Sequence, residues 1–374
     1  GLRATGYVRG PAVRVEAKVA QVGPRIDRLR HELRLAMQQA LGTDRYAGVL
    51  IALVLGDQRA ISASDWALFN QTGIAHLVSI SGLHITMVAG LMAAFGRALW
   101  RRSRRALKWA PAQSAAASIA VMAALAYCLL AGWGVPAQRT FFMLSVVALA
   151  LMARRGLRAP STLALAGTVV CVLDPWAVIA PGFWLSFGAV AAIMWALSGR
   201  VRSDVSKPSW RERVLDAGRV QLAVTVALIP LTIALFAQLS LVSPLANAVA
   251  IPLVSLVVTP LALLGAALLS LPAPLAALAA PVLTLAHEVF AALAQVLQFM
   301  VQWPAASLPW PAPPTWVLLC ALLGVAWMLA PRGWPVRWVG ALWWLPLALW
   351  PPARPATDEL WVTALDVGQG TAVL

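Results

Sequence analysis

Two stretches of this chain are long, apolar and free of charge: APAQSAAASIAVMAALAYCLLA at residues 110–131 and PLANAVAIPLVSLVVTPLALLGAALLS at residues 244–270. About 20 helical residues cross the roughly 30 Å hydrocarbon core of a bilayer, so both stretches are long enough to span it. Across the whole chain 61% of residues are hydrophobic and 11% are charged, whereas a soluble domain carries about 25% charged residues. The composition therefore predicts an integral membrane protein.

The spacing of the apolar stretches predicts an all-α polytopic membrane protein with about ten transmembrane helices. The stretch at 47–56 is too short to span and predicts a re-entrant or interfacial helix. Two of the predicted spans, 160–174 and 337–350, are short. The predicted spans are residues 73–96, 110–131, 135–153, 160–174, 182–198, 220–238, 244–269, 276–303, 315–330 and 337–350.

Both ends of the chain are predicted to belong to soluble domains that contain β-strands. Residues 12–19 alternate as a half-buried strand does, and residues 363–374 begin another strand. Because residue 1 is Gly and no signal peptide is visible, we expect an internal fragment of a longer protein. Residues 25–46 predict an amphipathic helix with a basic side, which lies on an anionic bilayer surface or packs on the preceding soluble domain.

The formal charge of +15 would suggest nucleic acid binding in a soluble protein. Cytoplasmic loops of membrane proteins, however, carry excess Lys and Arg whatever the protein does. If the first span runs from outside to inside, alternation places the basic loops 97–108, 154–158, 199–219 and 332–337 inside. Between the spans only Arg139 then falls outside. This orientation predicts that both soluble ends lie on the outer side of the membrane.

The first predicted span contains an unusual cluster of polar residues. His76, Ser79, Ser81 and His84 fall within nine residues, and polar groups in hydrocarbon cost free energy unless they are paired or hydrated. On one continuous helix His76, Ile80 and His84 would share a face. The cluster predicts a hydrated pore or gate face; the alternative is hydrogen bonding between helices.

Several motifs of the chain resemble one family in the same order along the sequence. HLVSISGLHI at 76–85 resembles the hallmark of the ComEC/Rec2 family, the inner-membrane competence proteins that import DNA. The remaining matches are GLRATGYVRG at 1–10, Gly56 with Asp57, PAQR at 136–139, GFWLSF at 182–187, residues 247–252 with Pro260, and DVGQG at 366–370. Thr371 departs from the family pattern, in which Asp usually follows DVGQG.

The resemblance implies a domain organisation and a function. Residues 1–24 would end an OB-like domain, residues 47–351 would form a channel for single-stranded DNA, and residues 358–374 would open a metallo-β-lactamase-like domain. The pore or gate candidates are His76, Ser79, Ser81, Gly82, His84 and Arg139. The C-terminal motif comprises Asp366, Gly368, Gln369 and Gly370.

The resemblance also implies partners and a location. The expected partners are single-stranded DNA, membrane lipids, a DNA receptor and a cytoplasmic helicase or motor, and a homo-oligomer remains open. The expected location is the bacterial inner membrane. Any metal ion or nuclease activity would belong to the C-terminal domain beyond Leu374, so neither a catalytic residue nor a cofactor is assigned to this chain.

Two other functions remain open from the residues themselves. Ser79, Ser81 and Gly82 loosely resemble the Gly-x-Ser-Gly of rhomboid proteases, and a serine hydrolase needs a base presented to the serine. His287 is the only His on another predicted span, where neighbouring Glu288 is expected to brace the helices by pairing. A transporter of small solutes or lipid is the second alternative, which paired broken helices would support.

Overall fold

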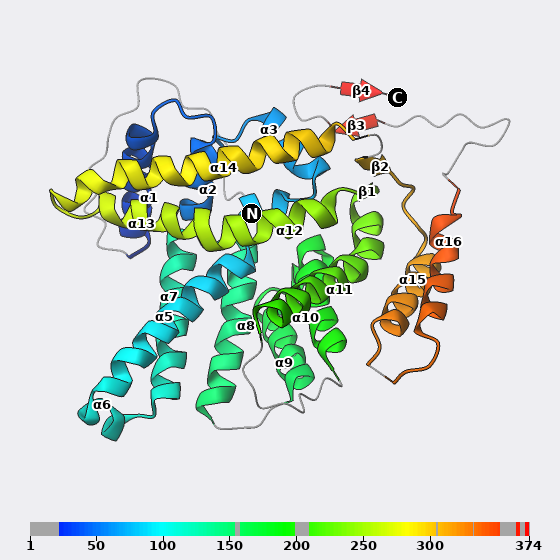
Figure 1. Ribbon diagram of the computed structural model, residues 1–374, viewed down its shortest axis with the longest axis horizontal. Helices are drawn as coiled ribbons and strands as arrows, with labels where there is room; N and C mark the ends of the chain where they lie inside the picture. Colours follow the sequence, from blue (N-terminus) through cyan, green and yellow to red (C-terminus); the bar gives the residue numbers. More distant parts are fainter. Residues whose placement is uncertain are drawn as a thin grey trace.

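The computed structural model describes residues 22–153, 158–198, 209–303, 306–331 and 333–351, and two short strands at 364–366 and 371–373. The described chain is almost entirely helical (Figure 1), which confirms the all-α polytopic fold. The predictions for residues 1–21 and for Gly368, Gln369 and Gly370 lie outside the described residues. Asp366 ends a strand, β3 (Ala364–Asp366), which pairs antiparallel with β4 (Thr371–Val373).

Six helical segments of the described chain are long and apolar enough to cross a membrane. They are α5 (Gly82–Arg102), α7 (Ala112–Leu130), α8 (Val135–Met152), α11 (Trp210–Phe236), the continuous run α12 (Ser243–Leu253), η2 (Val254–Val258) and α13 (Thr259–Leu269), and the pair η3 (Leu275–Leu278) and α14 (Ala279–Val301). Three shorter apolar helices are α9 (Ala159–Leu173), α10 (Pro181–Leu197) and α15 (Thr315–Met328). These segments match the predicted spans from 110–131 to 315–330, except that α11 begins ten residues before the predicted span 220–238.

The N-terminal helices form a compact layer with α13 and α14. This layer contains α1 (Val22–Leu41), α2 (Ala47–Leu55), α3 (Ala63–Gln71) and the single turn α4 (Ala75–Val78). Residues 48–55 of α2 are all buried, in a core that α1, α13 and α14 share. The predicted amphipathic helix is therefore α1, and it packs on the helical core through Leu33, Met37 and Leu41.

The remaining long helices extend away from this layer. In Figure 1, α13 and α14 run side by side across the picture, and α7 and α8 descend from them nearly at right angles. The C-terminal end of α7 joins the layer through hydrogen bonds. Tyr127 donates to the carbonyl of Leu53 (2.7 Å) and Arg30 donates to that of Leu130 (2.9 Å).

Two predicted spans differ from the structure. Residues 73–96 are not one helix, because α4 ends before residue 79 and α5 begins at Gly82. Residues 337–350 form η4 (Arg337–Trp344), a 3-10 helix, and one turn, α16 (Leu345–Ala348), which pack against α15. At the rise of these helices the two cover only about 22 Å, less than the hydrocarbon thickness. A further pair of strands, β1 (Gln238–Ser240) and β2 (Ser307–Pro309), is antiparallel. It joins the segment that follows α11 to the segment that follows α14.

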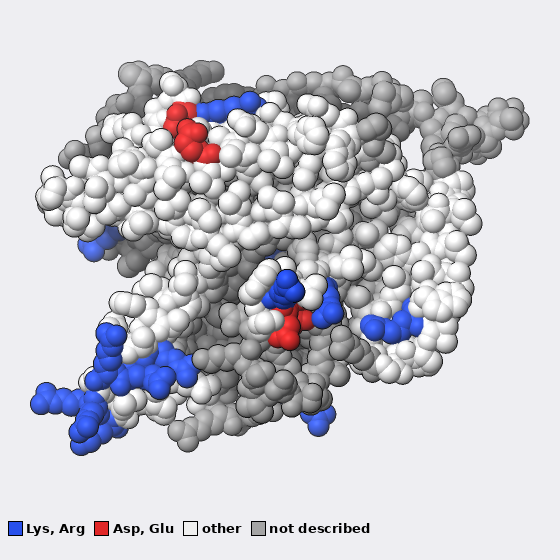
Figure 2. Space-filling view, in the orientation of Figure 1, with Lys and Arg blue, Asp and Glu red and all other residues white. Residues whose placement is uncertain are grey.

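Basic side chains gather at the ends of the long helices that point away from the layer. Figure 2 shows blue atoms concentrated over α6 (Arg104–Trp109) and the adjoining end of α5. The exposed residues of this patch are Arg97, Arg101, Arg102, Arg104, Arg105 and Lys108. The clustering agrees with a basic loop at one membrane face; which side of the membrane it faces stays a prediction.

Candidate functional site

The polar cluster of the sequence lies at a break between two helices, which we name the α4–α5 junction (residues 79–82). Ser79 and Ser81 both have extended backbone conformations, with ψ near 157°. Ser81 is the N-cap of α5, and its Oγ accepts a hydrogen bond from the backbone N–H of His84 (3.4 Å). Serine favours this capping role over a place inside a helix because its hydroxyl bonds the free backbone groups.

This break corrects the prediction that His76 and His84 share one helix face. His76 lies on α4, is exposed, and hydrogen-bonds the carbonyl of Gly73 through Nδ1 (3.1 Å). His84 lies in the first turn of α5 and is completely buried. The break therefore places the two imidazoles on different helices and in different surroundings.

The imidazole of His84 is unusual because it is buried without a hydrogen bond. Neither Nδ1 nor Nε2 has a partner among the described residues. A buried polar group without a partner costs about 1–3 kcal/mol, and such groups in folded proteins commonly contact water or a ligand. The serine hydroxyls do not fill this role, because Ser81 bonds the backbone of His84. The geometry therefore lacks the Ser–His contact that a serine hydrolase needs.

The α4–α5 junction is also where distant motifs meet, and glycines permit the approach. A Cβ on Gly82 would lie 2.7 Å from Thr140 Oγ1 on α8, and a Cβ on Gly182 of α10 would lie 2.6 Å from Arg139 Nη2. A Cβ on Gly56 would overlap the carbonyl of Ala131 and lie 3.3 Å from Ile80 Cδ1. Four motifs that are far apart in the sequence thus form one contact cluster.

Arg139, the predicted pore-mouth residue, is buried in the second turn of α8, with 6% of its surface exposed. Its Nε and Nη1 have no hydrogen-bond partner in the part of the chain that the structure describes. The side chain borders a cavity of about 170 Å³, whose lining also includes Val135, Gln138, Phe142, Val170, Leu173 and Asp174. A contact between Arg139 and DNA is not tested by this geometry and stays a prediction.

A second polar stripe follows α12 and its continuation. Asn247 donates to Ser243 Oγ (2.9 Å), while the hydroxyls of Ser255 and Thr259 are buried and unbonded to described groups. These residues lie four or eight positions apart, and the π-helical η2, which often marks functional sites, contains Ser255. The sequence analysis did not single out Ser255 and Thr259, although this four-residue spacing could have indicated them.

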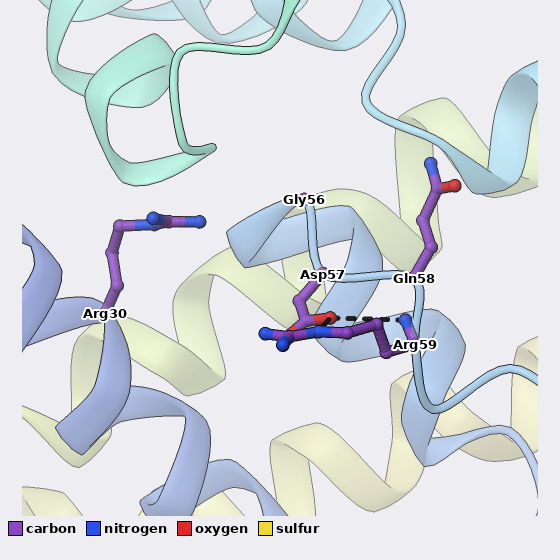
Figure 3. A pocket seen from close by; sticks show the side chains of 5 residues that line it. All are labelled: Arg30, Gly56, Asp57, Gln58 and Arg59. Atoms are coloured by element: carbon purple, nitrogen blue, oxygen red, sulfur yellow. Dashed lines mark hydrogen bonds and ion pairs between the residues drawn. The ribbon is translucent and has the colours of Figure 1, made fainter. Parts of the chain in front are cut away.

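An arginine-rich pocket lies at the end of α2, as Figure 3 shows. Its cavity of about 560 Å³ is lined by Arg30, Gly56, Asp57, Gln58 and Arg59. Asp57 forms ion pairs with Arg34 (2.6 Å) and Arg59 (2.9 Å). The hydrogen bonds from Arg59 contribute most to lowering the pKa of Asp57 from 3.8 to about 2. Gly56 ends α2 with a φ of +73°, a conformation that glycine adopts without strain. The arginines of this pocket were not predicted as partners of Asp57.

His287 and Glu288 lie on α14, and the polar contacts of His287 within the described chain are with Tyr46, Asp44 and Glu288. His287 Nε2 accepts a hydrogen bond from the backbone N–H of Tyr46 (3.4 Å), and Nδ1 lies 3.8 Å from Asp44 and 3.5 Å from Glu288. The side chain of Glu288 is 69% exposed. Among the described residues, no group of three His, Cys, Asp or Glu side chains is arranged to hold a metal ion.

The sequence of the chain was compared with known protein families and with individual proteins. A family model described as "Competence protein" matches residues 53–335, most of the chain. The chain belongs to the competence protein family. Competence protein ComA of Neisseria gonorrhoeae is 39% identical over 328 residues, which cover 87% of this chain and 44% of that protein.

Two more distant relatives carry related names. Recombination protein 2 of Haemophilus influenzae is 30% identical over 58% of this chain and 28% of its own length. ComE operon protein 3 of Bacillus subtilis is 26% identical over 60% of this chain and 27% of its own length. The chain thus spans less than half the length of each of these competence protein relatives. No solved structure matches it.

Proposed function

We propose that residues 47–351 form the membrane channel through which single-stranded DNA passes inward during natural transformation. The observation that carries the proposal is the buried imidazole of His84, which follows the α4–α5 junction directly and has no hydrogen-bond partner among the described residues of an otherwise apolar helical protein. Membership of the competence protein family supports a role in DNA uptake, as do the names of its relatives.

The physical requirement for such a channel is a hydrated path for a polyanion. A charge at the centre of a bilayer costs at least about 2.5 kcal/mol, and every nucleotide carries one. DNA therefore needs a water-lined route with weak, repeated contacts. The starts of α5 and α10 both approach the second turn of α8. Helix starts carry partial positive charge and favour phosphate, so this arrangement suits a strand of DNA.

Each candidate residue has a distinct part in the proposal. His76, Ser79 and Ser81 offer polar groups to the strand or to the water around it, and Gly82 lets α5 approach α8. His84 is the gate residue, because its imidazole nitrogens are free to bond a passing group. Asn247, Ser255 and Thr259 on the α12–α13 run offer a second polar wall, since η2 contacts α5.

The rest of the uptake system is proposed from the family pattern and the charge pattern. We place the protein in the bacterial inner membrane with both soluble ends outside, where an OB-like and a metallo-β-lactamase-like domain would handle DNA. A DNA receptor, a cytoplasmic helicase or motor, and further copies of the chain are the expected partners. Residues 1–374 contain no GxxxxGK nucleotide-binding loop, so we propose that the driving force comes from another protein or from strand degradation.

One structural observation favours a different candidate, a transporter of small solutes or lipid. Transporter sites are commonly built where helices are interrupted. This chain has an interrupted helix at the α4–α5 junction and a π segment at η2. The α12–α13 run remains helical throughout, however, so the two interruptions are not a repeated pair.

The experiment compares His84→Leu with Ile85→Leu in the full-length parent protein. Both replaced side chains are completely buried, and removing an imidazole without partners leaves no other group unbonded. The proposal predicts that His84→Leu reaches the membrane at the normal level but loses import of labelled DNA by at least about tenfold. Ile85→Leu should import normally. Normal import by His84→Leu would remove His84 from the path, and normal import without the parent protein would contradict the channel.

A further inference from the structure

We propose that the cavity beside Arg139 binds the headgroup of a zwitterionic phospholipid of the phosphatidylethanolamine class. Such a headgroup carries a phosphodiester anion and a primary ammonium a few bonds apart. The cavity presents one buried cation, Arg139, and one carboxylate, Asp174. The proposal does not rest on the DNA channel, because it requires only Arg139, Asp174 and the cavity that they line, and it assigns Arg139 to lipid instead of to DNA.

The cationic half of the site is Arg139, whose guanidinium is buried and has donors that no described group accepts. Arg139 is 94% buried, and its Nε and Nη1 donate to no described group. The guanidinium lies directly over Gly182, so that residue's missing side chain provides its space. A planar guanidinium offers paired donors that match two phosphate oxygens, and these charge-assisted bonds are the strong ones.

The anionic half of the site is Asp174, at the end of α9. Its Oδ1 accepts a hydrogen bond from the backbone N–H of Trp176 (3.2 Å), which fixes the carboxylate. Its Oδ2 has no bonded partner within the described chain. Arg139 and Asp174 line the same cavity without forming an ion pair between their described atoms. Two opposite charges that line one cavity complement a ligand that carries two opposite charges.

The size and surroundings of the cavity favour a lipid over DNA. A volume of about 170 Å³ equals that of roughly six water molecules in the liquid, which suits a small headgroup. The lining residues Val135 and Leu173 are exposed, as are neighbouring Val172 and Trp176. Exposed apolar side chains on a membrane protein face acyl chains, and Trp favours the headgroup level. A DNA path would require polar walls instead.

The test measures lipid retention by the purified full-length parent protein. Native mass spectrometry after incubation with phosphatidylethanolamine, phosphatidylcholine or phosphatidylglycerol gives the bound fraction of each. We expect phosphatidylethanolamine to bind about tenfold more tightly than the other two. The quaternary ammonium of phosphatidylcholine cannot donate to Asp174, and phosphatidylglycerol has no cation.

Three variants separate the two halves of the site. Arg139→Gln should lose retention of all three lipids, and Asp174→Asn should keep phosphate binding but lose the preference for phosphatidylethanolamine. Arg101→Gln removes an exposed arginine at the far end of α5. It should change neither the retention of the lipids nor the preference for phosphatidylethanolamine. If Arg139→Gln does not fold, Asp174→Asn carries the test alone.

Several outcomes would overturn the proposal. Equal binding of the three lipids would do so, as would an unchanged preference in Asp174→Asn. A single-stranded oligonucleotide that displaces the lipid, and whose binding requires Arg139, would assign this cavity to DNA and reject the lipid site.

Discussion

Helices α2 and α5 are both apolar, yet they lie in opposite surroundings. In α2, Leu50, Ile51 and Leu53 are at most 1% exposed, because α1, α13 and α14 enclose them. In α5, Leu91, Phe95 and Leu99 are 59%, 60% and 48% exposed. The apolar side chains of α2 are therefore buried by protein, whereas Leu91, Phe95 and Leu99 of α5 are covered only when lipid surrounds the helix.

The contrast explains where an interrupted helix can occur. Backbone groups freed by a break need partners, and hydrocarbon offers none. The α4–α5 junction lies between these two surroundings, where Ser81 caps one end and Ile80 packs against buried neighbours. Four predictions test the contrast, from the largest expected effect to the smallest.

The largest effect is expected from matched truncations of two phenylalanines. Phe290 is completely buried and contacts the rings of Tyr46 and Phe69 edge-on, while Phe95 is 60% exposed. Phe290→Ala should destabilise the folded protein by about 3–5 kcal/mol, and Phe95→Ala should have a much smaller effect. Thermal unfolding in one lipid nanodisc measures both. Equal losses would remove the distinction between the two surroundings.

The next effect concerns two glycines of α5. A Cβ on Gly82 would lie 2.7 Å from Thr140 Oγ1, while a Cβ on Gly90 would meet nothing within 4 Å. Gly82→Ala should destabilise by about 1–3 kcal/mol, and Gly90→Ala should stabilise slightly through helix propensity. Adding Thr140→Ala to Gly82→Ala should restore part of the loss. A double-mutant cycle without coupling between these residues would contradict the packing.

A smaller effect is expected at the arginine pocket and depends on pH. The folded-state pKa of Asp57 is about 2, below the ordinary 3.8, so its carboxylate stabilises the fold fully above about pH 4. That contribution, about 1–2 kcal/mol, is lost as pH falls from about 4 to 2. Asp57→Asn should lower stability at pH 7 and flatten the slope in this window. An unchanged slope would show that the ion pairs do not stabilise the fold.

The smallest effect separates the two serines of the α4–α5 junction. Ser81→Ala removes an N-cap hydrogen bond and should cost about 1 kcal/mol, whereas no described bond depends on the hydroxyl of Ser79, so Ser79→Ala should cost little. The double variant should weaken uptake without abolishing it, because neither hydroxyl acts as a nucleophile in this account. Complete loss of function by either stably folded variant would instead favour the serine hydrolase.

The sequence predicted those features that depend on local pattern. Uncharged runs such as 110–131 located α7 to within two residues at each end, because the hydrocarbon thickness fixes helix length. The helix break at Ser81 was missed, since residues 73–96 contain no Asp, Glu, Lys or Arg and predict one span, and the capping role depends on backbone direction. A Ser preceding Gly at the start of an apolar run was the available signal.

Contacts between segments that are far apart in the chain could not be predicted from a single sequence. Gly82 and Gly182 were recognised within motifs, but that they meet Thr140 and Arg139 follows only from helix packing. Likewise Glu288 was expected to brace the helices by pairing, whereas its side chain is 69% exposed and lies 3.5 Å from His287 of the same helix. The charge of a residue is visible in the sequence, whereas its surroundings are set by packing.

The most direct test of the channel is photocrosslinking of DNA arrested during import. A photoreactive residue replaces His76, which is exposed beside the α4–α5 junction, or Phe95, which is exposed on the outer face of α5. The account predicts that position 76 crosslinks to the DNA strand and position 95 to lipid. Crosslinking of DNA at position 95, or of lipid alone at position 76, would contradict a path through the junction.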